Sequence, residues 1–144
     1  PSTITRLQNM GTPDYLISAA CQLVVAQRLA RKNCKKCKIP DDDVNPKVLQ
    51  DLGFSAEQAS RVKAIKGKGC ETCSNTGYKG RQGIYEILVV SKPLKEAILR
   101  KATTPELRQI AVKEGFQTMQ DMGKRLIASG DLNFREYERV LSNE

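Results

Sequence analysis

Two pairs of cysteines are the residues whose type and spacing best suit a chemical role in this chain. The pairs are Cys34–Cys37 and Cys70–Cys73, separated by 32 residues without cysteine, and the chain contains no histidine. A C-x-x-C step places two thiolates on one tight turn, and two such steps supply the four sulfurs of a closed tetrahedral zinc site. A closed site has no open position for water or substrate, so its role lies in folding. The spacing therefore predicts a structural Zn²⁺ ion with the ligands Cys34, Cys37, Cys70 and Cys73.

Two other uses of the cysteine pairs are disfavoured by the rest of the sequence. Disulfides would need an oxidising compartment, and the N-terminus shows no secretory signal pattern. A redox-active dithiol needs only one C-x-x-C pair, so the second pair would be superfluous. The fifth cysteine, Cys21, lies in an apolar stretch, and we interpret it as a small buried hydrophobic side chain.

Composition and charge narrow the possible functions. Lysine and arginine outnumber aspartate and glutamate by 24 to 16, giving a net charge of +8. A Zn²⁺ ion held by four thiolates would lower this to about +6. The densest basic run, Arg31–Lys38, has a structural explanation because it offsets the negative charge of a tetrathiolate centre. Tryptophan is absent and aromatic residues are few, so nucleic-acid binding is only a minor alternative.

No segment approaches the roughly 20 apolar residues of a membrane span, which predicts a soluble, cytoplasmic chain.

The elements that must position the cysteines are indicated by helix start and stop signals. The loop between the pairs predicts two short helices, one capped by Asn45 and one that begins with the capping box Ser55–Gln58 and ends at Gly67. Such short helices do not persist alone, and a metal ion that pins both ends of the loop would support them. Residues 83–90 predict a strand that is apolar on both faces and therefore interior. Residues 23–29 fit a buried strand or a continued helix, and periodicity alone does not choose between them. Further helices are predicted within residues 4–10 and 13–20, and four more within residues 91–144.

Three ordered motifs extend beyond the cysteines themselves. They are Thr5-Arg6-Leu7 with Met10-Gly11, then Gln27-Arg28-Leu29 with Arg31, then Cys70-x-x-Cys73 followed by Thr76-Gly77-Tyr78-x-Gly80-Arg81-x-Gly83-Ile84-Tyr85-Glu86. With these motifs the whole chain resembles the C-terminal portion of the type IV pilus assembly and type II secretion ATPases, and the pilus-extension ATPases are favoured. The third motif is long and specific, and it carries more weight than either cysteine pair.

The resemblance implies an α+β fold that is mostly helical. It implies the C-terminal part of a RecA-like sheet, with strands near residues 22–31 and 83–90, a tetracysteine zinc lobe and a C-terminal helical bundle. The corresponding segments would be the end of the ATPase domain (1–33), the zinc lobe (34–78), the return strand (79–90) and the helical subdomain (91–144). The strand interpretation of residues 22–31 thus comes from the resemblance.

The resemblance also implies a function for the protein to which this chain would belong. The parent would be a homohexameric ATPase on the cytoplasmic side of the inner membrane, using ATP and Mg²⁺ to drive an inner-membrane platform protein. Pro1 begins the chain abruptly without an initiator methionine, which indicates a piece of a longer protein. The chain itself has neither a phosphate-binding loop nor a histidine box, so we expect it to be inactive alone, with no catalytic residues of its own.

One residue and one alternative function remain open at this point. Arg28 could face a nucleotide or a subunit interface, because a guanidinium can stabilise phosphate charge, and a surface salt bridge is an equal possibility. The alternative function is a zinc-ribbon-like binding module, either for nucleic acid or of a chaperone type. The chaperone alternative rests on residues 73–77, which weakly match the cysteine-rich repeats of J-domain proteins.

Overall fold

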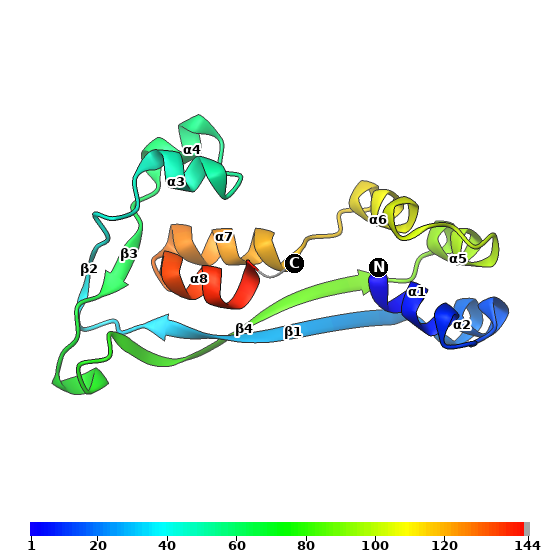
Figure 1. The fold of residues 1–144 in the computed structure, drawn as a ribbon, viewed down its shortest axis with the longest axis horizontal. Helices are drawn as coiled ribbons and strands as arrows, with labels where there is room; N and C mark the ends of the chain where they lie inside the picture. Colours follow the sequence, from blue (N-terminus) through cyan, green and yellow to red (C-terminus); the bar gives the residue numbers. More distant parts are fainter. Residues whose placement is uncertain (143–144) are drawn as a thin grey trace. The chain divides into compact units, whose positions relative to one another are not determined.

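The computed structural model describes residues 1–142, which form helices and short antiparallel strands in two compact units. Unit 1 comprises residues 1–26 and 85–118, and unit 2 comprises residues 27–84 and the described residues from Met119 onward. Two long strands, β1 (Leu23–Asn33) and β4 (Tyr78–Val89), pair with each other, and each contributes residues to both units. The α+β class and both predicted strands are confirmed (Figure 1).

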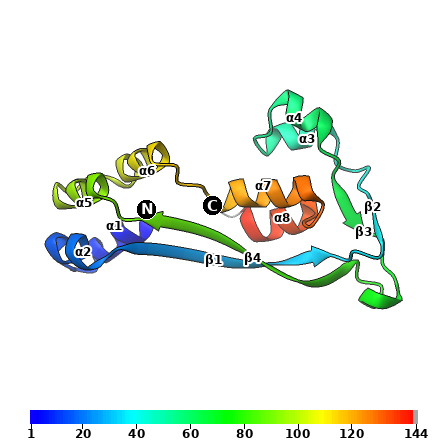
Figure 2. The ribbon, with the colours of Figure 1, turned by 180° about the vertical axis from the view of Figure 1, so that it is seen from behind.

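Unit 1 is a set of four helices packed on one face of the paired strands. The helices are α1 (Ser2–Asn9), α2 (Asp14–Ala20), α5 (Lys92–Leu99) and α6 (Thr104–Lys113), and they gather together in both ribbon views (Figure 2). Local signals fix their ends: Ser91 caps α5, and Thr103 forms a capping box with Glu106 at the start of α6. The core of the unit is apolar and includes Ile4, Ile17, Leu88, Leu94, Ile98 and Leu107.

The other face of the strands in unit 1 is exposed, which corrects the prediction that residues 83–90 are interior on both sides. Leu88 and Val90 are buried, whereas Ile87 and Val89 are 51% and 62% exposed. On β1, Leu23 and Val25 are 53% and 52% exposed. Since successive side chains of a strand point to opposite faces, these four residues share one outward face. A run that is apolar on both faces therefore predicts a strand, but it does not predict which of the two faces is buried in this chain.

Unit 2 contains the four cysteines of the two pairs and the remaining helices. Its elements are β2 (Lys38–Pro40), α3 (Pro46–Asp51), α4 (Ala56–Arg61), β3 (Ile65–Gly67), the 3₁₀ turn η1 (Glu71–Cys73), α7 (Met119–Ser129) and α8 (Phe134–Leu141). Asn45 caps α3 and the Ser55–Gln58 capping box starts α4, as predicted. Helices α7 and α8 pack side by side (Figure 1). Their apolar residues join those of α3 and α4 in one core, which includes Ala30, Leu49, Ala59, Ile84, Ile127 and Tyr137.

The second helix of the cysteine loop is shorter than predicted. It ends at Arg61, because Val62 already has extended dihedral angles, and Ile65–Gly67 forms β3 instead of continuing the helix to Gly67. Strand β3 pairs antiparallel with β2, with Lys38 opposite Gly67 and Pro40 opposite Ile65. The chain thus enters and leaves the α3–α4 segment through neighbouring strands, a pairing that local helix signals cannot reveal.

The four helices predicted within residues 91–144 are all present, but they divide between the two units. Helices α5 and α6 belong to unit 1, while α7 and α8 belong to unit 2. The two compact units therefore have different boundaries from the four segments expected from the sequence. The division into four segments stays a prediction.

Candidate metal centre

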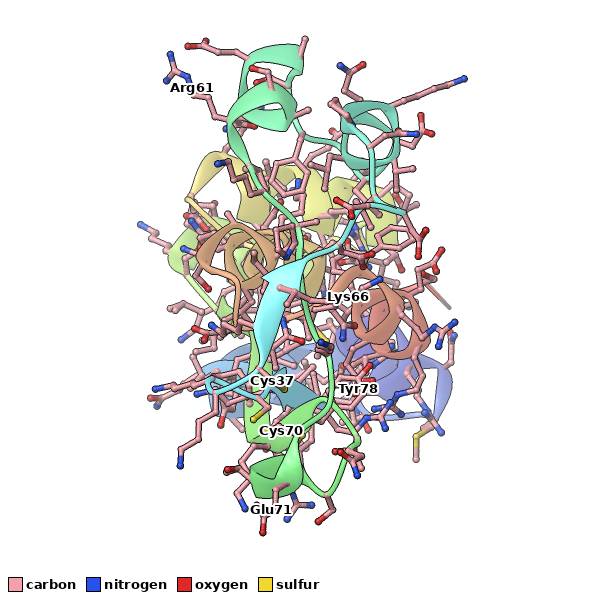
Figure 3. All side chains as sticks on the ribbon, turned by 90° about the vertical axis from the view of Figure 1, so that its left-hand side faces the viewer. Cys37, Arg61, Lys66, Cys70, Glu71 and Tyr78 are labelled. Carbon is pink, nitrogen blue, oxygen red and sulfur yellow. The ribbon has the colours of Figure 1, made fainter. Side chains whose placement is uncertain are left out.

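The structure brings together the four cysteines that the sequence singled out. Their sulfur atoms all lie within 4.8 Å of one another. The distance between Sγ atoms is 3.8 Å for Cys34 and Cys70, 3.9 Å for Cys37 and Cys73, and 3.7 Å for Cys70 and Cys73. A tetrahedron with metal–sulfur bonds of about 2.3 Å has edges of about 3.8 Å, so these separations fit a four-coordinate zinc site. Figure 3 shows Cys37 and Cys70, one from each pair, lying close together.

The first pair lies on a turn between two strands. Strand β1 ends at Asn33, β2 begins at Lys38, and the Cys37 N–H donates to the Cys34 carbonyl at 3.3 Å. The Cys34 N–H donates to the Gly77 carbonyl at 2.8 Å, which ties this turn to the segment after the second pair. Cys34 is buried, whereas Cys37 is half-buried.

The second pair lies on the 3₁₀ turn η1, which is followed by two residues in the left-handed region. Ser74 and Asn75 have φ angles of 52° and 61°. This tight reversal turns backbone N–H groups toward the sulfurs: Cys73 Sγ accepts from the Cys70 N–H at 3.2 Å and from the Gly77 N–H at 3.3 Å. Hydrogen bonds of this kind stabilise a thiolate, which is the form of cysteine that binds metal.

Burial and hydrogen bonds give the thiols of Cys37 and Cys73 different pKa values. Burial opposes ionisation of Cys73, but the N–H groups of Cys70 and Gly77 outweigh it and lower its pKa to about 6. Burial raises the pKa of Cys37 to about 11, assisted by the neighbouring thiols and opposed by the Gly69 N–H. Cys73 therefore ionises more readily than Cys37, and a bound cation would favour the thiolate form of Cys37.

Two glycines let the two halves of the site approach each other. A Cβ atom on Gly67 would lie 1.9 Å from the Gly77 carbonyl oxygen, and a Cβ on Gly77 would lie 2.5 Å from the Gly67 oxygen. No side chain fits at either position without displacing backbone. The contact between Gly67 and Gly77 thus joins the segments on either side of the second cysteine pair.

The donor set and the spacing of the four sulfurs suit a bound metal ion. All four donors are thiols, which suit zinc and other soft cations. Cys34 and Cys73 are 1% and 5% exposed, and four sulfurs at tetrahedral spacing leave no coordination position for a substrate. The arrangement fits a structural tetrathiolate centre.

A buried polar network beside the cysteines was missed by sequence reasoning. Glu136 is fully buried, and its carboxylate accepts from the Arg31 backbone N–H at 2.8 Å, from the Arg31 guanidinium at 2.8 and 3.1 Å, and from Arg139 Nε at 3.0 Å. Burial alone would raise the pKa of Glu136, but the two arginines lower it to about 2. The Arg31 guanidinium also stacks 4.1 Å from the centre of the Tyr78 ring. Glu136 also lies in the first turn of α8, where its N–H donates to Oδ1 of the capping residue Asn133.

Arg28, the other residue singled out from the sequence, lies in unit 2 and contacts α8. One of its guanidinium nitrogens donates to the Val140 carbonyl. This contact gives Arg28 a structural role within the chain, and a role toward a nucleotide or a neighbouring subunit stays a prediction.

Comparison with known proteins finds a family that matches nearly the whole chain. Residues 1–139 match the family described as "Type II/IV secretion system protein". The chain is 35% identical over 136 residues to the type IV pilus assembly ATPase PilB of Myxococcus xanthus, covering 94% of this chain and 24% of that protein. It is 36% identical over 138 residues to PilB of Pseudomonas aeruginosa, covering 96% of this chain and 24% of that protein.

A type II secretion protein is similar to the chain over nearly the same length. The protein HxcR of P. aeruginosa is 32% identical over 139 residues, covering 96% of this chain and 25% of that protein. The chain thus spans about a quarter of the length of these relatives. None of the helices within residues 1–142 is long and apolar enough to cross a membrane. The chain belongs to the type II/IV secretion system protein family.

Proposed function

We propose that this chain is the C-terminal structural and coupling region of a hexameric ATPase that powers type IV pilus extension or type II secretion. The tetracysteine cluster would hold one structural Zn²⁺ through Cys34, Cys37, Cys70 and Cys73. When bound, the ion would supply the closed coordination that fixes β2, β3 and the α3–α4 segment, and it would take no part in ATP hydrolysis.

The observation that supports this proposal best is the sulfur geometry within a matched family. Sulfur separations of 3.7 to 3.9 Å fit a tetrahedral zinc thiolate, and the family match runs through both cysteine pairs. Among these relatives, which match more than nine-tenths of this chain, the PilB proteins are 35% and 36% identical and HxcR is 32% identical, and this difference favours the pilus-extension ATPases. ATP and Mg²⁺ would then be cofactors of the full-length hexamer, whose partner would be an inner-membrane platform protein and whose location would be the cytoplasmic face of that membrane.

The outward face of β1 and β4 in unit 1 gives further support to a role within a longer protein. Exposed apolar residues on one side of a sheet suit contact with additional structure, and the relatives are about four times as long as this chain. We propose that this face packs against the rest of a RecA-like domain in the full-length ATPase.

Two experiments test the proposal at separate levels. The purified chain should contain one zinc ion per molecule by elemental analysis and should show no ATP hydrolysis with Mg²⁺. In the full-length protein, Cys70→Ser should abolish pilus extension or secretion while nucleotide binding by the ATPase domain is retained. A chain that hydrolyses ATP alone, or a Cys70→Ser protein that supports normal extension and secretion, would contradict the proposal.

A further inference from the structure

The turn between α7 and α8 is hydrogen-bonded to Asn33, the residue that precedes the first cysteine of the cluster. Among the described residues, the buried polar or charged side chains are Ser18, Asn33, Asn133 and Glu136, and the last three belong to one network in unit 2. Each of the two long strands adjoins a cysteine turn at the end that carries this network: β1 ends at Asn33, just before Cys34, and β4 begins at Tyr78, just after Gly77, whose N–H donates to a cysteine sulfur. The residues that orient the cysteines are therefore also contacts of α8.

Asn33 fixes the position from which the first cysteine turn begins. Its N–H donates to the Asp131 carbonyl at 2.8 Å, and its side-chain amide donates to the carbonyls of Gly130 and Ile65, each at 3.0 Å. Residues 130–131 belong to the turn before α8, and Ile65 begins β3. One buried side chain thus holds the residue before Cys34 against both segments.

Asn133 joins the same position to the start of α8 and to the second cysteine turn. Its Oδ1 accepts from the Glu136 N–H at 2.8 Å, which caps the helix. Its Nδ2 donates to Asn33 Oδ1 at 3.2 Å and to the Tyr78 hydroxyl at 3.0 Å. A single amide group therefore caps α8 with its oxygen and contacts both strands that lead to the cysteines with its nitrogen.

Two ion pairs reinforce this connection from either side. Glu136 binds the backbone and guanidinium of Arg31, which stacks on Tyr78. On the other side, the Lys38 ammonium, directly after Cys37, lies 3.3 Å from Asp131. Movement of α8 away from this position would break contacts to residues beside Cys34, Cys37 and Gly77.

We infer that metal binding at the tetracysteine cluster and docking of α8 are thermodynamically coupled, with Asn133 as the positioning residue that carries the coupling. This inference rests on the zinc site of the proposed function. Groups that orient metal ligands without touching the metal typically change metal affinity by about 10- to 100-fold when they are removed. Coupling between two equilibria is reciprocal, so the metal also strengthens the docking of α8 by the same factor.

The decisive variant is Asn133→Ser in the full chain. Serine is a good helix N-cap, so the cap of α8 is kept while the bonds to Asn33 and Tyr78 are lost. The matched control is Asn45→Ser, which makes the same change at the N-cap of α3, where the side chain accepts from the Val48 N–H. Zinc affinity is measured by competition with a chromophoric chelator, and the ligand geometry is followed in the visible spectrum of the Co²⁺-loaded chain.

We expect Asn133→Ser to weaken zinc binding about tenfold or more and to alter the Co²⁺ spectrum, with less than about a twofold effect from Asn45→Ser. Equal zinc affinity and equal spectra in both variants and the parent would overturn the inference while leaving the zinc site intact. If the parent chain binds no zinc, the inference and the proposed zinc site both fail.

A measurement on the unmodified chain covers the case in which Asn133→Ser does not fold. Hydrogen exchange is compared with and without bound zinc in α8 and, as an internal reference, in α5 of unit 1. Coupling requires that removal of zinc lowers the protection of α8 by about tenfold or more while α5 is unaffected. Unchanged protection of α8, or an equal loss in both helices, would overturn the inference.

Discussion

Replacing Glu136 with glutamine isolates the contribution of a single buried charge to the stability of unit 2. The side chain is fully buried, whereas the side chains of its partners Arg31 and Arg139 are 47% and 54% exposed. Glutamine keeps the shape and one acceptor oxygen but loses the negative charge that both guanidiniums contact. The variant therefore removes electrostatics with little change in packing.

The expected size of the effect follows from the pKa of Glu136. Lowering this pKa from 4.5 to about 2 corresponds to roughly 3 kcal/mol of folding free energy. Because water screens the half-exposed arginines, and because they can be hydrated once the carboxylate is gone, we expect a loss of about 2 kcal/mol. The folded-state pKa is depressed, so the contribution is complete above about pH 4.5 and is lost as the pH falls toward about 2.

Urea unfolding of zinc-loaded parent and variant at pH 7 and pH 5.5 measures this difference. Both pH values lie above the ordinary pKa of the carboxyl group, so the difference of about 2 kcal/mol should be the same at each. The control is Glu138→Gln, an exposed position on the same helix, which should change stability by less than about 0.5 kcal/mol. Equal stability of Glu136→Gln and the control would refute the assignment of Glu136 as a stabilising buried charge.

Three further predictions concern the cysteines and the glycine contact. Cys70→Ser should eliminate bound zinc by elemental analysis and lower the free energy of unfolding by several kcal/mol; a variant that melts like the parent would contradict a structural metal. Iodoacetamide should label only Cys21, which is half-buried, in the zinc-loaded chain and all five cysteines after chelation, as counted by mass spectrometry; labelling that ignores chelation would argue against metal protection. Gly67→Ala places a Cβ 1.9 Å from the Gly77 oxygen and should cost about 2 kcal/mol or more in urea unfolding, and a neutral effect would show that the contact is not tight.

Local signals in the sequence predict where several helices begin and which cysteines cluster. Capping by Asn45, Ser55 and Thr103 depends on hydrogen bonds within four residues, so it can be read from the chain directly. The C-x-x-C spacing likewise fixes which sulfurs lie on one turn. That the two turns meet was inferred from chemistry, and the sulfur separations in the structure agree with it.

The features that sequence reasoning missed depend on partners far away in the chain. Strand β3 exists because β2 offers it backbone partners, and residues 65–67 carry no strand signal of their own. In the sequence Glu136 is an ordinary residue of a first helical turn, yet one of its two arginine partners, Arg31, lies 105 positions earlier. Cys21 was interpreted as buried, and it is in fact half-buried against the core of unit 1. Contacts between residues so far apart in the chain leave no short pattern in the sequence from which they could be predicted.

The outward apolar face of β1 and β4 has a consequence for the solubility of the chain on its own. Leu23, Val25, Ile87 and Val89 lie on strands of a two-stranded sheet, and residues 84–90 combine high β-propensity with a single charge, Glu86. Short segments of this composition favour intermolecular strand pairing when they are exposed. We therefore expect the chain to bind hydrophobic dyes and to aggregate on concentration, and Val25→Thr with Val89→Thr to reduce both while keeping the strands intact.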